Sequence, residues 1–226
     1  MLDVQFSNTE YNVDGFRNFM QSMYNHTAFG LGQSFLVAFA VYAMGLTSFF
    51  MSGLMLWITM LAPLGMILYY SFRGQDWDLP TLTGFYYTFV TVMGVSLSTI
   101  FVRFTATSIV EALLVSALTF GCAALYGQVT KRDLSGMGNI LMFGLVGIII
   151  AAIVNLFLQS SGFSFIISCV GVVLFLGLTA YDTNVAKQIY AETEDPRYGI
   201  KFALALYLNF INLFQMILSL TGMREE

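Results

Sequence analysis

Long runs without a formal charge constrain this chain more than any other feature. Between Arg17 and Arg73 lie 55 residues without a charged side chain, interrupted only by His26. A helix needs roughly 20 apolar residues to cross about 30 Å of hydrocarbon. The run is therefore long enough for two membrane-spanning helices, and the sequence GLTS at Gly45–Ser48 predicts the turn between them.

The remaining runs predict five more spans. Leu79–Val102 is one span, and Phe104–Thr130 is another in which only Glu111 is charged. The 48 residues between Asp133 and Asp182 hold two spans with a break at Gln159–Gly162, and Phe202–Met223 is the last span. We therefore expect an all-α integral membrane protein with seven transmembrane helices.

Composition agrees with this interpretation. The chain is 58% apolar and 10% charged, whereas soluble domains are about 45–50% apolar and 25% charged. Nine Lys and Arg against thirteen Asp and Glu make no basic surface for nucleic acid. We expect residues 1–26 to form a short cytoplasmic tail or amphipathic lead-in, 27–222 a single seven-helix domain in contact with the lipid bilayer, and 223–226 a C-terminal tail. The segment Ala191–Gly199 is predicted to be the longest solvated loop.

The distribution of basic residues predicts the orientation in the membrane. Cytoplasmic loops carry an excess of Lys and Arg. One predicted side holds seven basic residues and the other holds two, Arg103 and Arg224. This places the N-terminus in the cytoplasm and the C-terminus outside. A bacterial plasma (inner) membrane is favoured, and an organelle membrane stays open. The seven are Arg17, Arg73, Lys131, Arg132, Lys187, Arg197 and Lys201.

Two acidic residues fall inside predicted spans, where ionisable groups are costly and usually functional. Asp182 is predicted at the cytoplasmic end of the sixth span, and the small or polar residues on its helical face should pack against other helices. That face carries Thr179, Phe175, Gly171 and Ser168. An Asp solvated at a helix end is the alternative. Glu111 could line an outer vestibule or hydrogen-bond a neighbouring helix.

The last span carries a polar stripe. Asn209, Asn212, Met216 and Ser219 recur at a spacing of three to four residues, with Gln215 beside them. Unsatisfied amides are expensive in hydrocarbon, so this helix should lie in the middle of a bundle. Hydrogen bonds between helices could explain the stripe without any transport role.

Retinal proteins and intramembrane enzymes with seven helices find no support in the sequence. A retinal protein needs a lysine in the middle of the seventh helix, whereas Lys201 is at its start. The only histidine, His26, lies at the foot of the first span, and Asp182 is the only Asp in the membrane. No nucleophile and base are therefore paired, and we expect neither catalysis nor a cofactor.

Four segments resemble the Bax inhibitor motif family. They are YGQVTKRDLSGMG (Tyr126–Gly138), NLF (Asn155–Phe157), GLTAYDTNVAK (Gly177–Lys187) and ALALYLNFINLF (Ala203–Phe214). The resemblance implies six helices around a central, C-terminal seventh. It also implies a pH-influenced calcium leak channel gated near the cytoplasmic face, with Ca²⁺ and protons as its partners.

The family's site residues carry over only in part. The resemblance implies that Asp182 is the first of two sensor aspartates, that Arg73 can latch onto them, and that Glu111 is the family acid of the fourth helix. Asn209 stands where the family has its second aspartate. The polar residues Asn155, Asn212, Gln215 and Ser219 are expected to be structural.

The Asn209 substitution has a physical consequence. Two carboxylates in contact share one proton, whereas Asn cannot titrate and can donate its NH₂ group to Asp182. We expect pH sensitivity that is weaker or shifted to acid. Because Ca²⁺ takes about 6–8 oxygen ligands, Asp182 alone would bind it only weakly. Two alternatives stay open: a non-conducting protein that modulates a membrane-bound protease or a stress response, and a proton-coupled transporter.

Overall fold

The computed structural model describes residues 13–223, and every regular element in that range is helical. In this range, long helices are accompanied by four short helical segments of three or four residues, α2, η1, α5 and η2. The elements are α1 (Val13–Ala43), α2 (Thr47–Phe50), α3 (Gly53–Arg73), η1 (Gly74–Asp76), α4 (Leu79–Leu97), α5 (Ile100–Arg103), α6 (Ala106–Val129), η2 (Ser135–Met137), α7 (Gly138–Leu158), α8 (Ser161–Thr193) and α9 (Arg197–Thr221).

Six helical segments of residues 13–223 are long and apolar enough to cross a membrane. They contain α3, α4 with α5, α6, α7 with η2, α8 and α9. The chain is thus an integral membrane protein in contact with the bilayer. The remaining predicted span lies in α1, which has 31 residues but is less apolar than the others. Two of its polar side chains, Thr27 and Ser34, are buried.

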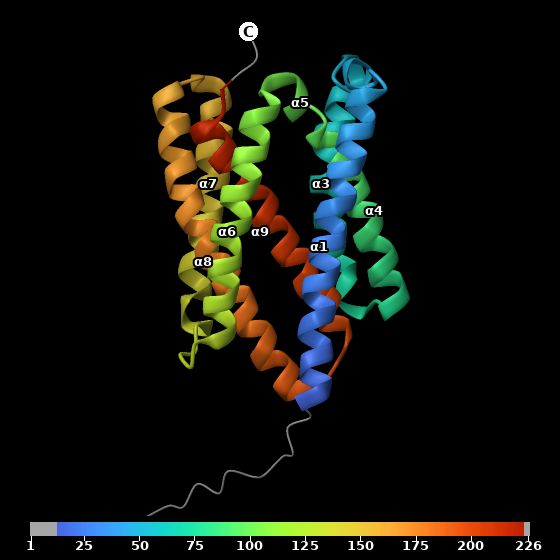
Figure 1. Ribbon diagram of the computed structural model, residues 1–226, viewed down its shortest axis with the longest axis vertical. Coiled ribbons are helices and arrows are strands. Elements are labelled where there is room, and N and C mark those ends of the chain that lie inside the picture. The colour runs from blue at the N-terminus through green and yellow to red at the C-terminus, as the bar shows by residue number, and fades with distance from the viewer. Residues whose placement is uncertain (1–12, 224–226) are drawn as a thin grey trace, which may run out of the picture.

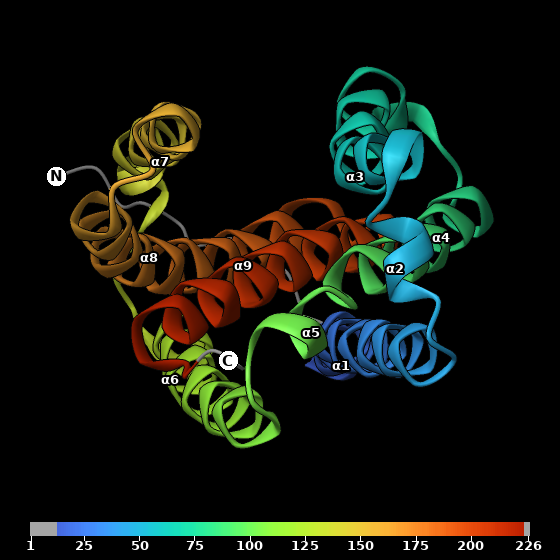
Figure 2. The ribbon, with the colours of Figure 1, turned by 90° about the horizontal axis from the view of Figure 1, so that it is seen from above.

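The helices form two groups on either side of α9. Figure 2 shows α6, α7 and α8 on one side and α1, α3 and α4 on the other, with α9 running between them. Helix α9 packs against α1, α4, α6 and α8, and it is the most buried of the candidate spans. Helices α3 and α7 lie farther out, packed chiefly on α4 and α8 respectively.

The predicted turns are found where the sequence places them. Gly45 has a φ of 70° between α1 and α2, a left-handed conformation that glycine adopts without steric cost. Helix α7 ends at Gln159, whose φ is 48°. Asn155 stabilises this second turn because its Oδ1 accepts a hydrogen bond from the Ser160 amide at 3.2 Å.

The prediction that Asp182 lies at a helix end is wrong. Helix α8 continues for eleven more residues to Thr193, a rise of about 16 Å. The predicted long loop over Ala191–Gly199 is wrong for the same reason, because only Glu194–Pro196 separates α8 from α9. A helix makes its own backbone hydrogen bonds and so can continue into water after the apolar run has ended.

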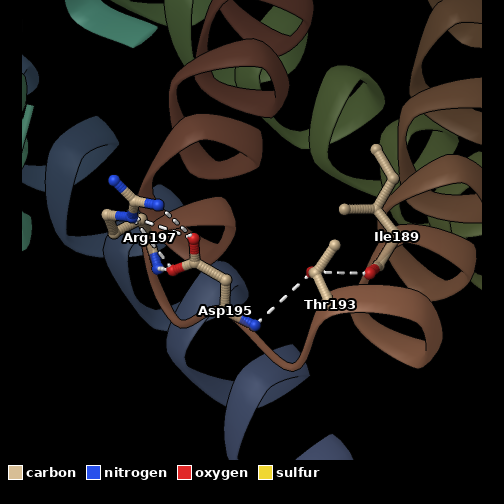
Figure 3. A network of polar contacts seen from close by, with 4 residues as sticks. All are labelled: Ile189, Thr193, Asp195 and Arg197. Atoms are coloured by element: carbon tan, nitrogen blue, oxygen red, sulfur yellow. Dashed lines mark hydrogen bonds and ion pairs between the residues drawn. The ribbon is translucent and has the colours of Figure 1, made fainter. Parts of the chain in front are cut away.

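The short turn between α8 and α9 is held by local polar contacts (Figure 3). Thr193 donates from Oγ1 to the Ile189 carbonyl at 2.8 Å, and the Asp195 amide donates to that Oγ1 at 3.4 Å. The Arg197 guanidinium lies 2.7 Å from Asp195 Oδ2. Its side-chain hydrogen bonds hold the pKa of Asp195 below the usual range. The turn sets how α8 and α9 run back along each other.

Candidate functional site

The site centres on one contact between α8 and α9. Asn209 donates from Nδ2 to Oδ2 of Asp182 at 2.7 Å. Asn209 is 6% exposed, and Asp182 is half-buried. Because Asn209 lies near the middle of α9, the two side chains meet deep in the bundle. A carboxylate at such a position is normally paired and functional.

The face of α8 that carries Asp182 packs inward, as the sequence predicts. Thr179, Phe175 and Ser168 are all buried. Gly171 lies against the Met216 side chain of α9, where a β-carbon would approach the Met216 Cγ to 3.0 Å. The small residues of this face therefore let α8 and α9 approach closely around the Asp182–Asn209 pair.

The polar stripe of α9 divides into three parts. Asn209 reaches α8, whereas Asn212 donates from Nδ2 to the Leu208 carbonyl of its own helix at 2.8 Å. Gln215 and Ser219 are exposed and line a cavity near the end of α9. Interhelical hydrogen bonding thus accounts for one of the predicted polar residues.

The other predicted site residues lie away from the pair. Arg73 ends α3, which Figure 2 shows on the opposite side of α9 from α8. Its side chain is exposed, and within residues 13–223 no ion pair joins it to Asp182. Glu111 is exposed in the second turn of α6. Asn155 belongs to the α7–α8 turn.

A cluster of apolar side chains closes the bundle beyond the pair, toward the end where α1 begins (the lower end in Figure 1). We call these six residues the apolar plug. Ala186 and Tyr190 follow Asp182 by one and two turns of α8, and Leu206 precedes Asn209 on α9. All six are at most 8% exposed. The members are Phe19, Met20, Met23, Ala186, Tyr190 and Leu206.

The residues after Asp182 hold the α6–α7 connection, a role that the sequence analysis missed. Asn184, 1% exposed, donates from Nδ2 to the carbonyls of Gly127 at 3.2 Å and Arg132 at 3.3 Å. Its Oδ1 accepts from the Leu134 amide at 3.0 Å and from Gln188 Nε2 at 2.7 Å. No sequence signal identified this role, because the predicted sixth span ends at Asp182 and Asn184 lies beyond it.

Lys187 and Gln188 add to the contacts of Asn184, and we call these three residues of α8 the clamp. The clamp joins two of the segments that carry the family resemblance. Its ammonium donates to the carbonyls of Gln128 at 3.3 Å and Thr130 at 2.9 Å, near the end of α6. Asp133 in the same connection accepts from Gln188 at 3.0 Å. Hydrogen bonds from Ser135 and Gln188 hold the pKa of Asp133 below its usual range. Helix α8 is thereby tied to α6 just below the site.

Helices α1, α4 and α9 are joined by a second buried polar network. Ser34 donates to the Val90 carbonyl at 2.7 Å and shares a 2.6 Å hydrogen bond with the Tyr207 hydroxyl. Gln33 donates to Thr91 Oγ1 at 2.7 Å. These contacts give Gln33 and Ser34 of α1 hydrogen-bond partners inside the bundle.

An apolar cavity of about 280 Å³ lies between α1, α6 and α9. Its lining residues include Phe35, Leu113, Ile211 and Phe214, and Ser34 is the one with a polar side chain.

The capacity of the Asp182–Asn209 pair for a metal ion is limited. Within residues 13–223, no three His, Cys, Asp or Glu side chains lie close enough together to hold a metal ion. The site therefore offers Ca²⁺ a single carboxylate with neutral oxygens around it.

Comparison with known families identifies the family of this chain. The sequence profile described as inhibitor of apoptosis-promoting Bax1 matches residues 16–226. The chain belongs to the Bax inhibitor family. The match covers every element that builds the site, from the buried residues of α1 to the end of α9.

Relatives of this Bax inhibitor family member occur in several bacteria. It is 37% identical to an uncharacterised protein of Caulobacter vibrioides, over 94% of this chain and 91% of the relative. An uncharacterised protein of Rickettsia prowazekii is 36% identical, over 94% and 92%. The inner membrane protein YbhL of Escherichia coli is 40% identical over 73% of each chain. This last likeness supports a bacterial inner membrane as the location.

Proposed function

We propose that this Bax inhibitor family protein is a cation leak channel, with Ca²⁺ as the principal ion, whose path passes the Asp182–Asn209 pair. The observation that carries the proposal is the 2.7 Å contact that holds a carboxylate deep between two helices. A charged group is costly in that position, and neither Arg nor Lys neutralises Asp182 within residues 13–223. A carboxylate beside neutral oxygens attracts a cation weakly enough to release it.

The apolar plug is the proposed closed gate. Hydrophobic constrictions close channels because water does not enter them. The plug lies one turn beyond Asp182, on the side where α1 begins, and the excess of Lys and Arg assigns that side to the cytoplasm. The gate is thus near the cytoplasmic face, although Asp182 itself lies deeper than the sequence predicted.

A seven-span arrangement around α9, with the N-terminus inside and the C-terminus outside, is part of the proposal. In this scheme helix α1 is the first span, and together with the six candidate spans it makes seven. Its polar residues bond α4 and α9, and its outer face is apolar, with Phe29 68% and Leu36 66% exposed. The average composition of α1 therefore understates how well its outer surface suits lipid.

Calcium flux into proteoliposomes tests the channel. Asp182→Ala should abolish or strongly reduce the flux, whereas Asp14→Ala, which removes an exposed carboxylate of α1, should leave it unchanged. Equal flux through wild type and Asp182→Ala would exclude the pair from the path. No flux through folded wild-type protein would favour the alternative below.

The pH dependence tests the role of Asn209. We expect wild type to respond weakly across roughly pH 5–8, because only one carboxylate is present at the pair. Asn209→Asp should add a proton shared between two carboxylates and steepen the response in that range. Asn139→Asp adds the same charge on the exposed start of α7, and it should not steepen the pH response. Coincident profiles for wild type and Asn209→Asp would contradict this account.

Arg73 and Glu111 have subsidiary roles in the proposal. Arg73 can act as a latch on Asp182 only after α3 or α9 has moved, and Glu111 would be an acid of the outer mouth. Arg73→Gln and Glu111→Gln test each role separately in the flux assay. We propose no catalytic activity and no cofactor.

The alternative function is a non-conducting protein that modulates a membrane-bound protease or a stress response. The short acidic segment at residues 1–16, most of which lies outside the described residues, would be its contact. Pull-down of a membrane protease with the full chain, but not with a variant lacking residues 1–16, would support this alternative. Flux through purified protein would oppose it.

A further inference from the structure

A second cavity lies next to α5, the short helix near the upper end in Figure 1. It has a volume of about 530 Å³ and is enclosed by α3, α4, α5 and α9. Ligand sites in proteins have about 300–1,000 Å³. Its wall combines the apolar side chains of Met60, Leu64 and Met93 with the polar side chains of Arg103, Gln215 and Ser219.

The polar groups of the cavity divide into satisfied and free ones. The hydroxyls of Ser96 and Thr99 donate to backbone carbonyls at 2.6 and 3.1 Å. By contrast, the side chains of Arg103, Gln215 and Ser219 make no hydrogen bond or ion pair within residues 13–223. One guanidinium, one amide and one hydroxyl are thus left as donors for a ligand. This set suits an anion with several oxygens, and phosphate above all.

The cavity lies at the ends of two candidate membrane spans. Arg103 is the last residue of its membrane span, and Ser219 is two residues from the end of α9 at Thr221. This end is held in place, because the Met223 amide donates to Ser108 Oγ at 2.9 Å and the Thr105 amide to the Met223 carbonyl at 3.2 Å. Hydrocarbon gives way to headgroups at such helix ends.

A lipid can enter this cavity from the side. Helix α3 has no buried residue and packs chiefly on α4, so its side of the cavity faces the bilayer. Acyl chains would lie along Met60, Leu64 and Met93 while the headgroup reaches the free donors. A long Arg side chain suits this arrangement, because its stem lies on apolar surface and its charged end lies at the interface.

We propose that this cavity binds the phosphate of a membrane phospholipid through Arg103, with Gln215 and Ser219 as neutral donors. The lipid belongs to the leaflet next to the C-terminal end of α9. It would fill the space between α3 and α9 and join the outlying α3 to the bundle. This site is independent of the proposed channel.

Binding of short-chain phosphatidylglycerol to delipidated protein, followed by native mass spectrometry, tests the site. Arg103→Gln should weaken binding about tenfold, since it removes a charge-assisted hydrogen bond. Gln215→Met should weaken it about threefold by removing a neutral donor. Arg132→Gln is the matched control, because it removes an exposed arginine near the opposite end. Equal affinities for Arg103→Gln and Arg132→Gln would overturn the proposal.

Two further arms identify the ligand. Short-chain diacylglycerol lacks the phosphate, so it should bind no better to wild type than to Arg103→Gln. If wild type retained diacylglycerol as well as phosphatidylglycerol, the headgroup assignment would be overturned. Millimolar inorganic phosphate should displace the lipid poorly. Full displacement at that concentration would overturn the lipid assignment in favour of a soluble anion. Unchanged melting temperatures of both variants keep these results independent of folding.

Discussion

Asn184→Ala should destabilise the protein more than truncation of any other polar side chain near the site. Asn184 is 1% exposed and takes part in four hydrogen bonds, three of which join α8 to α6 and to the connection that follows α6, while the fourth is with Gln188 of α8 itself. Alanine leaves the Leu134 amide and two carbonyls without these partners. It also removes the acceptor that orients Gln188.

The magnitude follows from the number of bonds. Hydrogen bonds in membrane proteins average about 0.6 kcal/mol, and those in water-soluble proteins about 1 kcal/mol. Four bonds therefore contribute about 2.4–4 kcal/mol. Alanine recovers about 0.6 kcal/mol because it is the better helix former. The expected loss in the free energy of unfolding is about 2–3 kcal/mol.

Reversible unfolding in mixed detergent micelles, followed by tryptophan fluorescence, measures this loss. Asn139→Ala is the control, because Asn139 is exposed in the first turn of α7 and should change stability by less than about 0.5 kcal/mol. Hydrogen exchange should also quicken at residues 130–137 in Asn184→Ala. A loss below about 1 kcal/mol with unchanged exchange would refute the clamp as a source of stability.

Two further predictions concern helix approach and the α8–α9 turn. Gly127→Ala would place a β-carbon against the carbonyl oxygen of Ala180 in α8, so α6 and α8 must separate. We expect the free energy of unfolding to fall by about 1–3 kcal/mol in the same assay. An unchanged stability would contradict this close approach. Asp195→Asn removes the ion pair with Arg197 and should lower the melting temperature by about 2 °C at neutral pH. The pKa of Asp195 is lower in the folded state than in the unfolded state. The ion pair therefore contributes to stability at pH values above the ordinary pKa near 4, and this contribution is lost as the pH falls through the lowered pKa. The melting difference should therefore vanish in acid, and a difference that persists there would refute the ion-pair explanation.

Much of the helical architecture could be predicted from the sequence. The turns at Gly45 and Gln159 lie where apolar runs exceed the thickness of a bilayer, which is a constraint on local sequence alone. The end of α8 could not be predicted this way. Its last eleven residues are polar enough for water yet remain helical, because nothing in them breaks backbone hydrogen bonding before the turn at Glu194.

The site was predictable in part. The contact between Asp182 and Asn209 was expected from the family resemblance, which pairs these two positions. Asn184 was missed because it lies beyond the predicted end of the sixth span, and because most of its partners are backbone groups of α6 and of the connection after it, which carry no sequence signal. Backbone carbonyls look identical in every sequence, so such contacts appear only in three dimensions.

The sequence by itself determined that this chain folds in a membrane, where two of its turns lie, the family to which it belongs and the single carboxylate at the pair. These are properties of composition and local order. Tertiary structure alone decided that Arg73 and Glu111 lie apart from Asp182, that six apolar residues from α1, α8 and α9 close the bundle, and that Arg103 shares a cavity with Gln215 and Ser219. The physical reason is that these arrangements depend on which helix faces meet, and many pairings of apolar faces satisfy the hydrophobic pattern of a membrane span equally well.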